Sequence, residues 1–252
     1  MRNRLFYKTA SFTLIALCLI FSACKSSVEI KANADTSCQI SAQLESGKII
    51  SSAIEEVLQT FSFVDPSSSY VTKEVSIFSA QDIKEALSMG MSDVKVTTDG
   101  KENLSISGRL PETGKQNATL DNEITKAANF LACTKSSLTL ILSRENIQNL
   151  VSSLPEETKS FVSLLMPPVM DEEEMSKEEY INLLSAVYGN NIAEEINKAV
   201  IKVSLLPPEG KSILKSSSDD KNAEILSNRA TFSLPLVTLL TLEETKTFSI
   251  IW

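Results

Sequence analysis

The side chains that most often carry catalysis and metal binding are scarce in this chain, which has no histidine among its 252 residues. Imidazole is the usual general base near neutral pH and the commonest metal ligand, so its absence excludes a Ser-His-Asp triad, a Cys-His dyad and every His-ligated zinc or iron site. Carboxylate-pair catalysis, a Ser-Lys dyad and oxygen-bound calcium stay open, but none has a recognisable pattern here. We therefore expect a protein that is not an enzyme and holds no cofactor or metal, with a carboxylate-based hydrolase as the alternative.

Four cysteines are the other reactive groups. Cys18 lies within an apolar leader and Cys24 directly follows it, which leaves Cys38 and Cys133 for the folded chain. In an exported protein these two could form one disulfide, closing a loop of roughly 96 residues and contributing on the order of 4 kcal/mol. Two separate buried thiols are an equal alternative, because the sequence cannot place the two Cα atoms within bridging distance.

The segment FVSLLMPPVMDEEEM, residues 161–175, joins an apolar run to four consecutive acids. Its apolar side chains could contact lipid tails or a hydrophobic ligand, since methionine suits adaptable surfaces. The candidate contacts are Phe161, Leu164, Leu165, Met166, Val169 and Met170. Apolar runs of this size are more often core, and that interpretation is favoured. The acids at 171–174 lack the EF-hand spacing, so a solvated loop is favoured over a calcium site.

The first 24 residues have the order of an export signal. Three basic residues, Arg2, Arg4 and Lys8, precede an apolar run at 12–21, and the small residues Ser22 and Ala23 lead into Cys24. A transmembrane helix is the weaker interpretation, because the uncharged run is interrupted by polar residues and is short of about 20 apolar positions. We expect cleavage before Cys24.

The sequence Phe21-Ser22-Ala23-Cys24 resembles the lipobox of bacterial lipoproteins, with Phe in place of the usual leading Leu, a departure tolerated in spirochaetal lipoproteins. This resemblance implies acylation of Cys24 and attachment to the bacterial cell envelope, at the outer membrane, with the leaflet left open. Two or three acyl chains would hold firmly, since each buried methylene contributes roughly 0.8 kcal/mol. The mature chain also resembles, in pattern alone, treponemal outer-membrane lipoproteins that insert amphipathic helices into bilayers.

The net charge of the mature chain disfavours two classes of partner, nucleic acids and anionic lipids. Removing the three basic residues of the leader leaves 21 of the 24 Lys and Arg against 32 Asp and Glu, a formal charge of about −11. Nucleic-acid binding needs clustered basic residues, and no basic stripe exists here. Charge-driven attachment to anionic lipid is disfavoured for the same reason.

Hydrophobic periodicity gives the elements that must position these residues. The spacing predicts helices at 47–64, 80–88, 121–133, 144–166 and 176–200. Alternation predicts strands at 70–78, 136–143, 200–206, 230–236, 234–242 and 245–252, and a hairpin over 94–110 that turns at Asp99-Gly100. Ser176 and Glu179 have the spacing of a capping box.

These elements predict an α+β fold, an antiparallel sheet covered by several amphipathic helices. The expected organisation is a cleaved signal at 1–23, a lipidated tether at 24–37 and a single domain at 38–252. A non-catalytic envelope protein whose domain binds lipid, a hydrophobic ligand or a membrane surface is the preferred function. The alternative is a surface or periplasmic protein-interaction module, an adhesin or an envelope-assembly partner, that uses a sheet edge or the 161–175 segment. A lined cavity would favour the first hypothesis and a filled core the second.

Overall fold

The structure is a computed structural model that describes residues 25–45, 80–88, 90–99, 103–111, 130–152, 162–163, 165–170, 174–218 and 223–252. Two predicted elements, the helix at 47–64 and the strand at 70–78, lie outside the described residues, as does Cys24.

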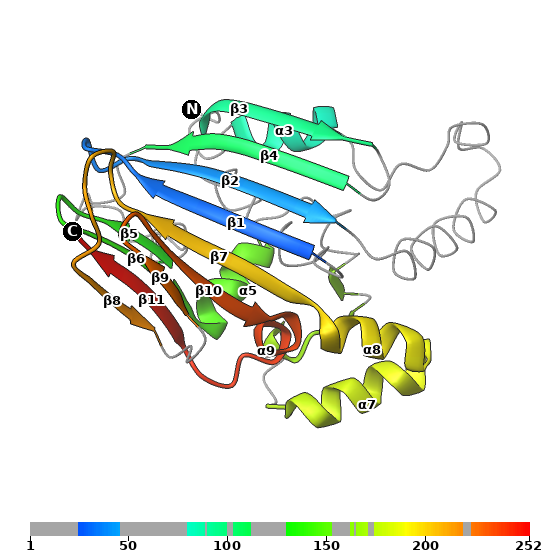
Figure 1. The fold of residues 1–252 in the computed structure, drawn as a ribbon. Helices are drawn as coiled ribbons and strands as arrows, with labels where there is room; N and C mark the ends of the chain where they lie inside the picture. The colour runs from blue at the N-terminus through cyan, green and yellow to red at the C-terminus, as the bar shows by residue number, and fades with distance from the viewer. Residues whose placement is uncertain are drawn as a thin grey trace.

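The larger of two sheets, sheet A, has seven strands (Figure 1). In spatial order they are β3 (Ser92–Thr98), β4 (Asn103–Leu110), β2 (Cys38–Glu45), β1 (Lys25–Ala32), β7 (Val200–Leu206), β10 (Arg229–Pro235) and β9 (Glu224–Leu226). Neighbours pair antiparallel except β1 and β7, which are parallel, with Val28 opposite Val203. The parallel pair joins the N-terminal hairpins to the C-terminal strands.

A second, four-stranded sheet, sheet B, is antiparallel throughout. Its spatial order is β5 (Leu131–Cys133), β6 (Ser137–Leu142), β11 (Lys246–Ile251) and β8 (Lys215–Ser218). The last strand of the chain, β11, lies in the interior of this sheet, as its apolar alternation predicts.

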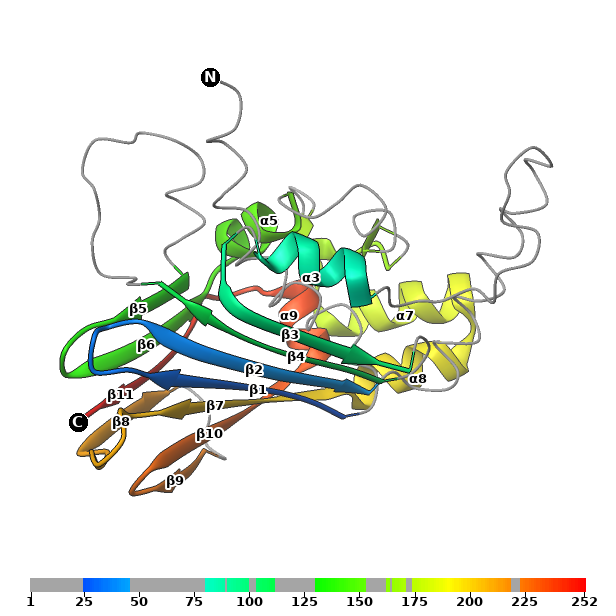
Figure 2. The same ribbon diagram turned by 90° about the horizontal axis from the view of Figure 1, so that it is seen from above.

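Five α-helices occur in the part of the chain that the structure describes. They are α3 (Ala80–Ser88), α5 (Arg144–Ser152), α7 (Lys177–Tyr188), α8 (Asn190–Lys198) and α9 (Leu236–Thr241), with a 3-10 turn, η3 (Pro168–Met170). Figure 2 shows α3 and α5 on one side of sheet A, which we call its inner face; the opposite side is its outer face. Helices α7 and α8 lie beside the end at which β7 begins (Figure 1).

The core lies on the inner face of sheet A, where every second residue of the central strands is buried. The inward side chains are Val28, Ile30, Ala32, Cys38, Ile40, Ala42, Leu44, Leu104, Ile106, Leu110, Ile201, Val203, Leu205, Ala230, Phe232 and Leu234. Sheet B packs against this face, since the rings of Phe232 on β10 and Phe248 on β11 have centroids 5.0 Å apart. Both rings are buried, at 0% and 3% exposure.

The expected antiparallel sheet covered by several amphipathic helices is therefore wrong. Among the described residues, 44% are in strands and 32% are helical, in two sheets with few helices. A second sheet does part of the covering that helices were expected to do, and one strand pair of sheet A is parallel. Periodicity identifies elements one at a time, and it does not say which apolar face packs on which.

The expected tether at 24–37 also differs from the structure, because residues 25–32 form β1 in the middle of sheet A. The strand alternates buried Ser26, Val28, Ile30 and Ala32 with half-buried polar residues. Its period of two was present in the sequence, but small and charged residues concealed it. The described domain thus begins one residue after Cys24.

The run at 234–242, predicted as a central strand, instead contains helix α9. Five of the six helical residues are buried, so a short run that is apolar all round carried no period to separate helix from strand. The end of the predicted helix at 121–133 is likewise strand β5, because Leu131 and Cys133 face the core while Ala132 does not.

Local patterns were confirmed where the ends of elements carry specific residues. The hairpin forms as β3 and β4, and residues 80–88 form α3. The capping box is present at the start of α7: the Glu179 backbone N–H donates to Ser176 Oγ, and the Ser176 N–H donates to Glu179 Oε2 at 2.9 Å. Gly189 ends α7 with φ 87°, so the predicted helix at 176–200 divides there into α7 and α8.

Candidate functional site

The apolar run at 161–170 lies against the core where it is described. Val169 is 2% exposed, and Leu165, Met166 and Met170 are half-buried. Phe161 and Leu164 lie outside the described residues. Neighbouring side chains hold the backbone: Arg144 Nη1 donates to the Pro168 carbonyl and Gln148 Nε2 to the Val169 carbonyl, both at 2.9 Å. The described part of this segment therefore packs against the core, with Leu165, Met166 and Met170 partly exposed.

Tyr180 on α7 is hydrogen-bonded to the same segment, and removal of its hydroxyl is expected to lower the free energy of unfolding. The Tyr180 hydroxyl donates to the Leu165 carbonyl at 2.7 Å, and the side chain is fully buried. Tyr180→Phe leaves that carbonyl without its donor and should lower the free energy of unfolding by about 1–2 kcal/mol, measured by urea denaturation. Asn182→Ala, an exposed change on the same helix, should shift it by less than about 0.5 kcal/mol. Equal effects in the two variants would show that the hydroxyl does not hold the segment.

Cys38 and Cys133, the candidate disulfide pair, are brought together from different sheets. Cys38 begins β2 of sheet A and Cys133 ends β5 of sheet B, and they are 0% and 1% exposed. Both are free thiols in this structure. A hydrogen bond between the two thiols, helped by burial, raises the pKa of Cys38 well above its ordinary range. The pair is thus placed for a disulfide but does not have the lowered pKa and access of an attacking thiol at Cys38.

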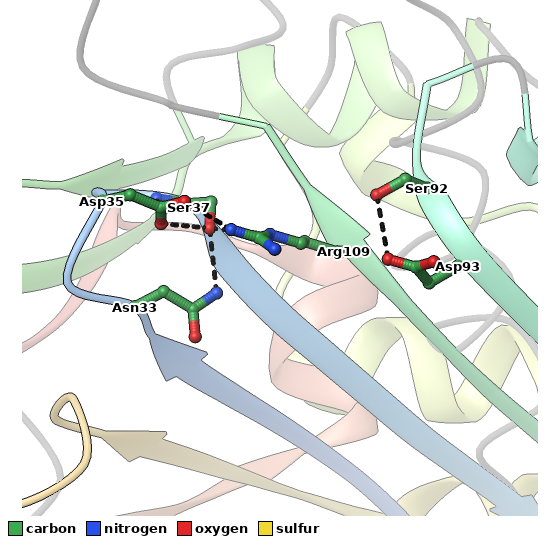
Figure 3. Close-up of polar contacts among 6 residues, drawn as sticks. All are labelled: Asn33, Asp35, Ser37, Ser92, Asp93 and Arg109. Atoms are coloured by element: carbon green, nitrogen blue, oxygen red, sulfur yellow. Dashed lines mark hydrogen bonds and ion pairs between the residues drawn. The ribbon is translucent and has the colours of Figure 1, made fainter.

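The turn between β1 and β2 holds a hydrogen-bonded cluster of polar side chains that sequence reasoning missed (Figure 3). Ser37 Oγ donates to Asp35 Oδ1 at 2.6 Å and accepts from Asn33 Nδ2 at 2.9 Å and Arg109 Nε at 3.0 Å. Arg109 on β4 also forms an ion pair with Asp35. We call these four residues the turn clamp. In the sequence, the only sign of this clamp is the run Asp35-Thr36-Ser37, whose residue types are common in turns.

The chemistry of the turn clamp is structural. A hydroxyl has one proton to donate and two lone pairs, and the Ser37 hydroxyl uses all three within the clamp. It therefore has no free lone pair for nucleophilic attack. The clamp also holds Thr36 at φ 66°, a conformation that β-branched residues rarely adopt. A nearby hydrogen bond from Ser92 to Asp93, at 3.4 Å, is separate from the clamp (Figure 3).

Asp35 gives the turn clamp a predictable pH dependence. Hydrogen bonds from the Ser37 hydroxyl and backbone N–H, followed by the charge of Arg109, lower the pKa of Asp35 below its ordinary value. A lowered pKa means that the ionised clamp stabilises the fold above about pH 4 and that this stabilisation is lost as the pH falls through the lowered pKa. The melting temperature of Asp35→Asn should lie below that of the wild type at pH 7, and the gap should close in acid. An exposed control, Glu209→Gln, should show no such gap at either pH; a gap for Asp35→Asn that is unchanged in acid would contradict this role.

The outer face of sheet A is a continuous polar surface. One row of outward side chains crosses all seven strands in register: Lys95, Ser107, Ser41, Glu29, Ser204, Thr231 and Glu224. The hydroxyls of Ser204 and Thr231, neighbours in this row, are 3.0 Å apart, and Glu29 forms an ion pair at 2.7 Å with Arg229, which lies two residues from Thr231 on β10. Helices α3 and α5 lie on the opposite side of the sheet (Figure 2).

A cavity of about 710 Å³ lies at one end of sheet A, where β1, β4 and β7 begin and β2 and β3 end. The described residues that line it are Ser26, Ser27, Gln43, Leu44, Glu45, Thr97, Thr98, Asp99, Asn103, Leu104, Ser105, Val200 and Lys202. Its volume falls in the range of small-molecule sites. Ten of the 13 described lining residues are polar, and the apolar ones, Leu44, Leu104 and Val200, do not form the elongated apolar tunnel that a carrier of lipid tails would need.

The cavity contains two carboxylates, Glu45 and Asp99, and the Asp99 carboxylate is hydrogen-bonded within the β3–β4 turn. Asp99 accepts hydrogen bonds from the Asn103 backbone N–H at 2.9 Å and from Asn103 Nδ2 at 2.6 Å, which closes the β3–β4 turn. Asp99 therefore serves as a hydrogen-bond acceptor that stabilises the turn. A carboxylate-based hydrolase needs two carboxyl groups that face each other across a cleft and are free to act, and Asp99 does not meet this requirement. Within the described residues there is also no group of three or more side chains placed to hold a metal.

None of the helices in the described ranges is long and apolar enough to cross a membrane. No protein-family model matches the chain, and no curated protein matches it.

Proposed function

We propose that this protein is a lipid-anchored, non-catalytic module of the bacterial envelope that binds a protein partner through the outer face of sheet A. The observation that carries the proposal is the row of polar side chains in register across all seven strands, on the side of the sheet opposite helices α3 and α5. Hydroxyl and charged groups in fixed register offer directional hydrogen bonds and charge complementarity but little apolar area, so the matching surface of the partner would itself be polar.

The filled core favours this interaction module over a carrier of hydrophobic ligands. The apolar sides of α7 and α8 are buried: Tyr180, Leu184 and Ile196 are each 0% exposed and Ala193 is 2% exposed. These faces already pack in the domain, so they are not free to lie in a bilayer. The described part of the 161–170 run is committed to the core in the same way.

The lipid anchor places this module at a membrane, and the proposal needs it. Mass spectrometry of the native protein should find a mature chain that begins at Cys24 and carries acyl chains. Cys24→Ser should remove the acyl chains, so that any chain cleaved from its leader is found in the soluble fraction and not with membranes. An unmodified Cys24 in the native protein would remove the membrane location.

Site-specific crosslinking in intact envelopes tests the outer face itself. A photoreactive amino acid at Ser107 should give one discrete adduct, and the same probe at Lys211, an exposed position outside the outer-face row, should not. A bulky block on the neighbouring strand, Ser41→Trp, should reduce the Ser107 adduct at least tenfold, whereas Lys211→Trp should leave it unchanged. No adduct, or an adduct that Ser41→Trp does not reduce, would contradict binding through this face.

A further inference from the structure

The cavity at the end of sheet A opens on outward side chains of its central strands. Because side chains alternate along a strand, Ser27, Gln43, Ser105 and Lys202 point to the outer face, and the register places them in one row. Glu45 lies one step closer to the end of the sheet, opposite Asn103. The cavity therefore offers neutral hydrogen-bonding groups between two charged side chains.

Those two charges, Glu45 and Lys202, are free to bind a ligand. Both side chains are exposed, and neither forms an ion pair with another described residue. β2 and β7 flank β1, so their Cα atoms are about 12 Å apart, two strand spacings across and two residues along. A separation of about 12 Å leaves room between the two charged groups for a small molecule that carries both signs of charge.

The cavity lies close in sequence to Cys24, the expected site of acylation, and this position indicates which ligands are near it. Ser26 and Ser27 line it, and they follow Cys24 by two and three residues. An extended chain spans at most about 3.5 Å per residue, so an acylated Cys24 would hold this end of the sheet within roughly 10 Å of the bilayer surface. Lipid headgroups would be the most concentrated small ligands at that place.

We propose that this cavity binds the headgroup of a zwitterionic phospholipid, with the ammonium against Glu45 and the phosphate against Lys202. Hydrogen bonds in which both groups are charged are roughly twice as strong as neutral ones, and lysine binds phosphate as a point charge. Ser27, Gln43 and Ser105 supply neutral donors and acceptors for the phosphate and glycerol oxygens. The inference rests on the lipid anchor of the proposed function but not on the protein partner.

The test uses the mature chain, residues 24–252 with Cys24→Ala, which retains every described element. Glycerophosphoethanolamine, the soluble headgroup, should bind in a calorimetric titration, whereas glycerophosphoglycerol, which lacks the ammonium, and inorganic phosphate should bind at least tenfold more weakly. Glu45→Gln and Lys202→Gln should each weaken binding of glycerophosphoethanolamine at least tenfold. The matched controls Glu243→Gln and Lys211→Gln, two exposed residues that do not line the cavity, should bind as the wild type does.

A vesicle arm identifies the source of the headgroup. The same chain should float with phosphatidylethanolamine and phosphatidylcholine vesicles, and Glu45→Gln should reduce flotation. Binding of the soluble headgroup without flotation would mean a free phosphodiester ligand and would overturn the lipid assignment. The site would be overturned if glycerophosphoethanolamine did not bind the wild type. It would also be overturned if the Glu45 and Lys202 variants bound glycerophosphoethanolamine as tightly as the wild type does. If the cavity does not bind the headgroup but the photoreactive probe at Ser107 still crosslinks to a protein partner, the headgroup site is wrong and the proposed function stands.

Discussion

Oxidation of Cys38 and Cys133 to a disulfide is expected to raise the free energy of unfolding by about 4 kcal/mol, which corresponds to a melting temperature roughly 10 °C higher. Both thiols are buried, and the Cys133 thiol raises the pKa of Cys38, so the two side chains lie close to one another. A disulfide such as oxidised glutathione takes up the two electrons and two protons that the thiols lose, and it becomes two thiols. The link would join the start of β2 to β5 and so tie sheet A to sheet B.

The measurement compares melting temperatures in oxidised and reduced glutathione, with mass spectrometry to count the two hydrogens lost. A double variant, Cys38→Ala with Cys133→Ala, controls for effects of the buffer and should melt at the same temperature in both. Since neither thiol is exposed by more than 1%, oxidation should be slow and should accelerate in mild urea. A chain that keeps two free thiols after prolonged oxidation in mild urea would show that the pair is a buried thiol contact only.

Phe232→Ala is expected to lower the free energy of unfolding by about 3–5 kcal/mol, because the ring is fully buried at the junction of the two sheets. The ring lies 5.0 Å from that of Phe248, at an interplanar angle of 44°. Truncation removes the transfer free energy of the ring and leaves a cavity between β10 and β11. Urea denaturation measures the change.

A double-mutant cycle with Phe248→Ala isolates the contact between the rings, and its coupling energy should be about 0.5–1.5 kcal/mol. Phe232→Leu, which retains much of the apolar volume, should cost less than the alanine variant. Thr247→Ala, an exposed neighbour of Phe248, should change stability by no more than about 0.5 kcal/mol. A coupling energy near zero would mean that the two sheets do not share a core at this point.

The elements that were predicted from the sequence carry their signal in neighbouring residues. The hairpin of β3 and β4 alternates about a turn, and α7 begins at a capping box whose two residues are three positions apart. Strand β11 alternates buried Phe248 and Ile250 with more exposed residues. In each case the conformation is set within a few residues, so a local pattern suffices.

The elements that were missed depend on distant partners. Strand β1 is half polar and resembles a tether until β2 and β7 pair with it on both sides. Helix α9 is buried at five of its six positions, and its place between β10 and the other helices, rather than any period, makes it helical. The turn clamp was missed because Arg109 reaches Asp35 and Ser37 only after β4 pairs with β2.

By itself the sequence determined what chemistry this protein lacks, because a chain without imidazole cannot use it in any fold, and it determined the local elements whose caps and alternation are complete within a few residues. Only the tertiary structure decided that the two thiols meet, that the amphipathic helices of the C-terminal half bury their apolar sides, and that polar residues from seven strands form one face with a cavity at its end. The physical reason is that a side chain's direction follows from its own strand, whereas its neighbours follow from strand order and register, which the packing of the whole core sets.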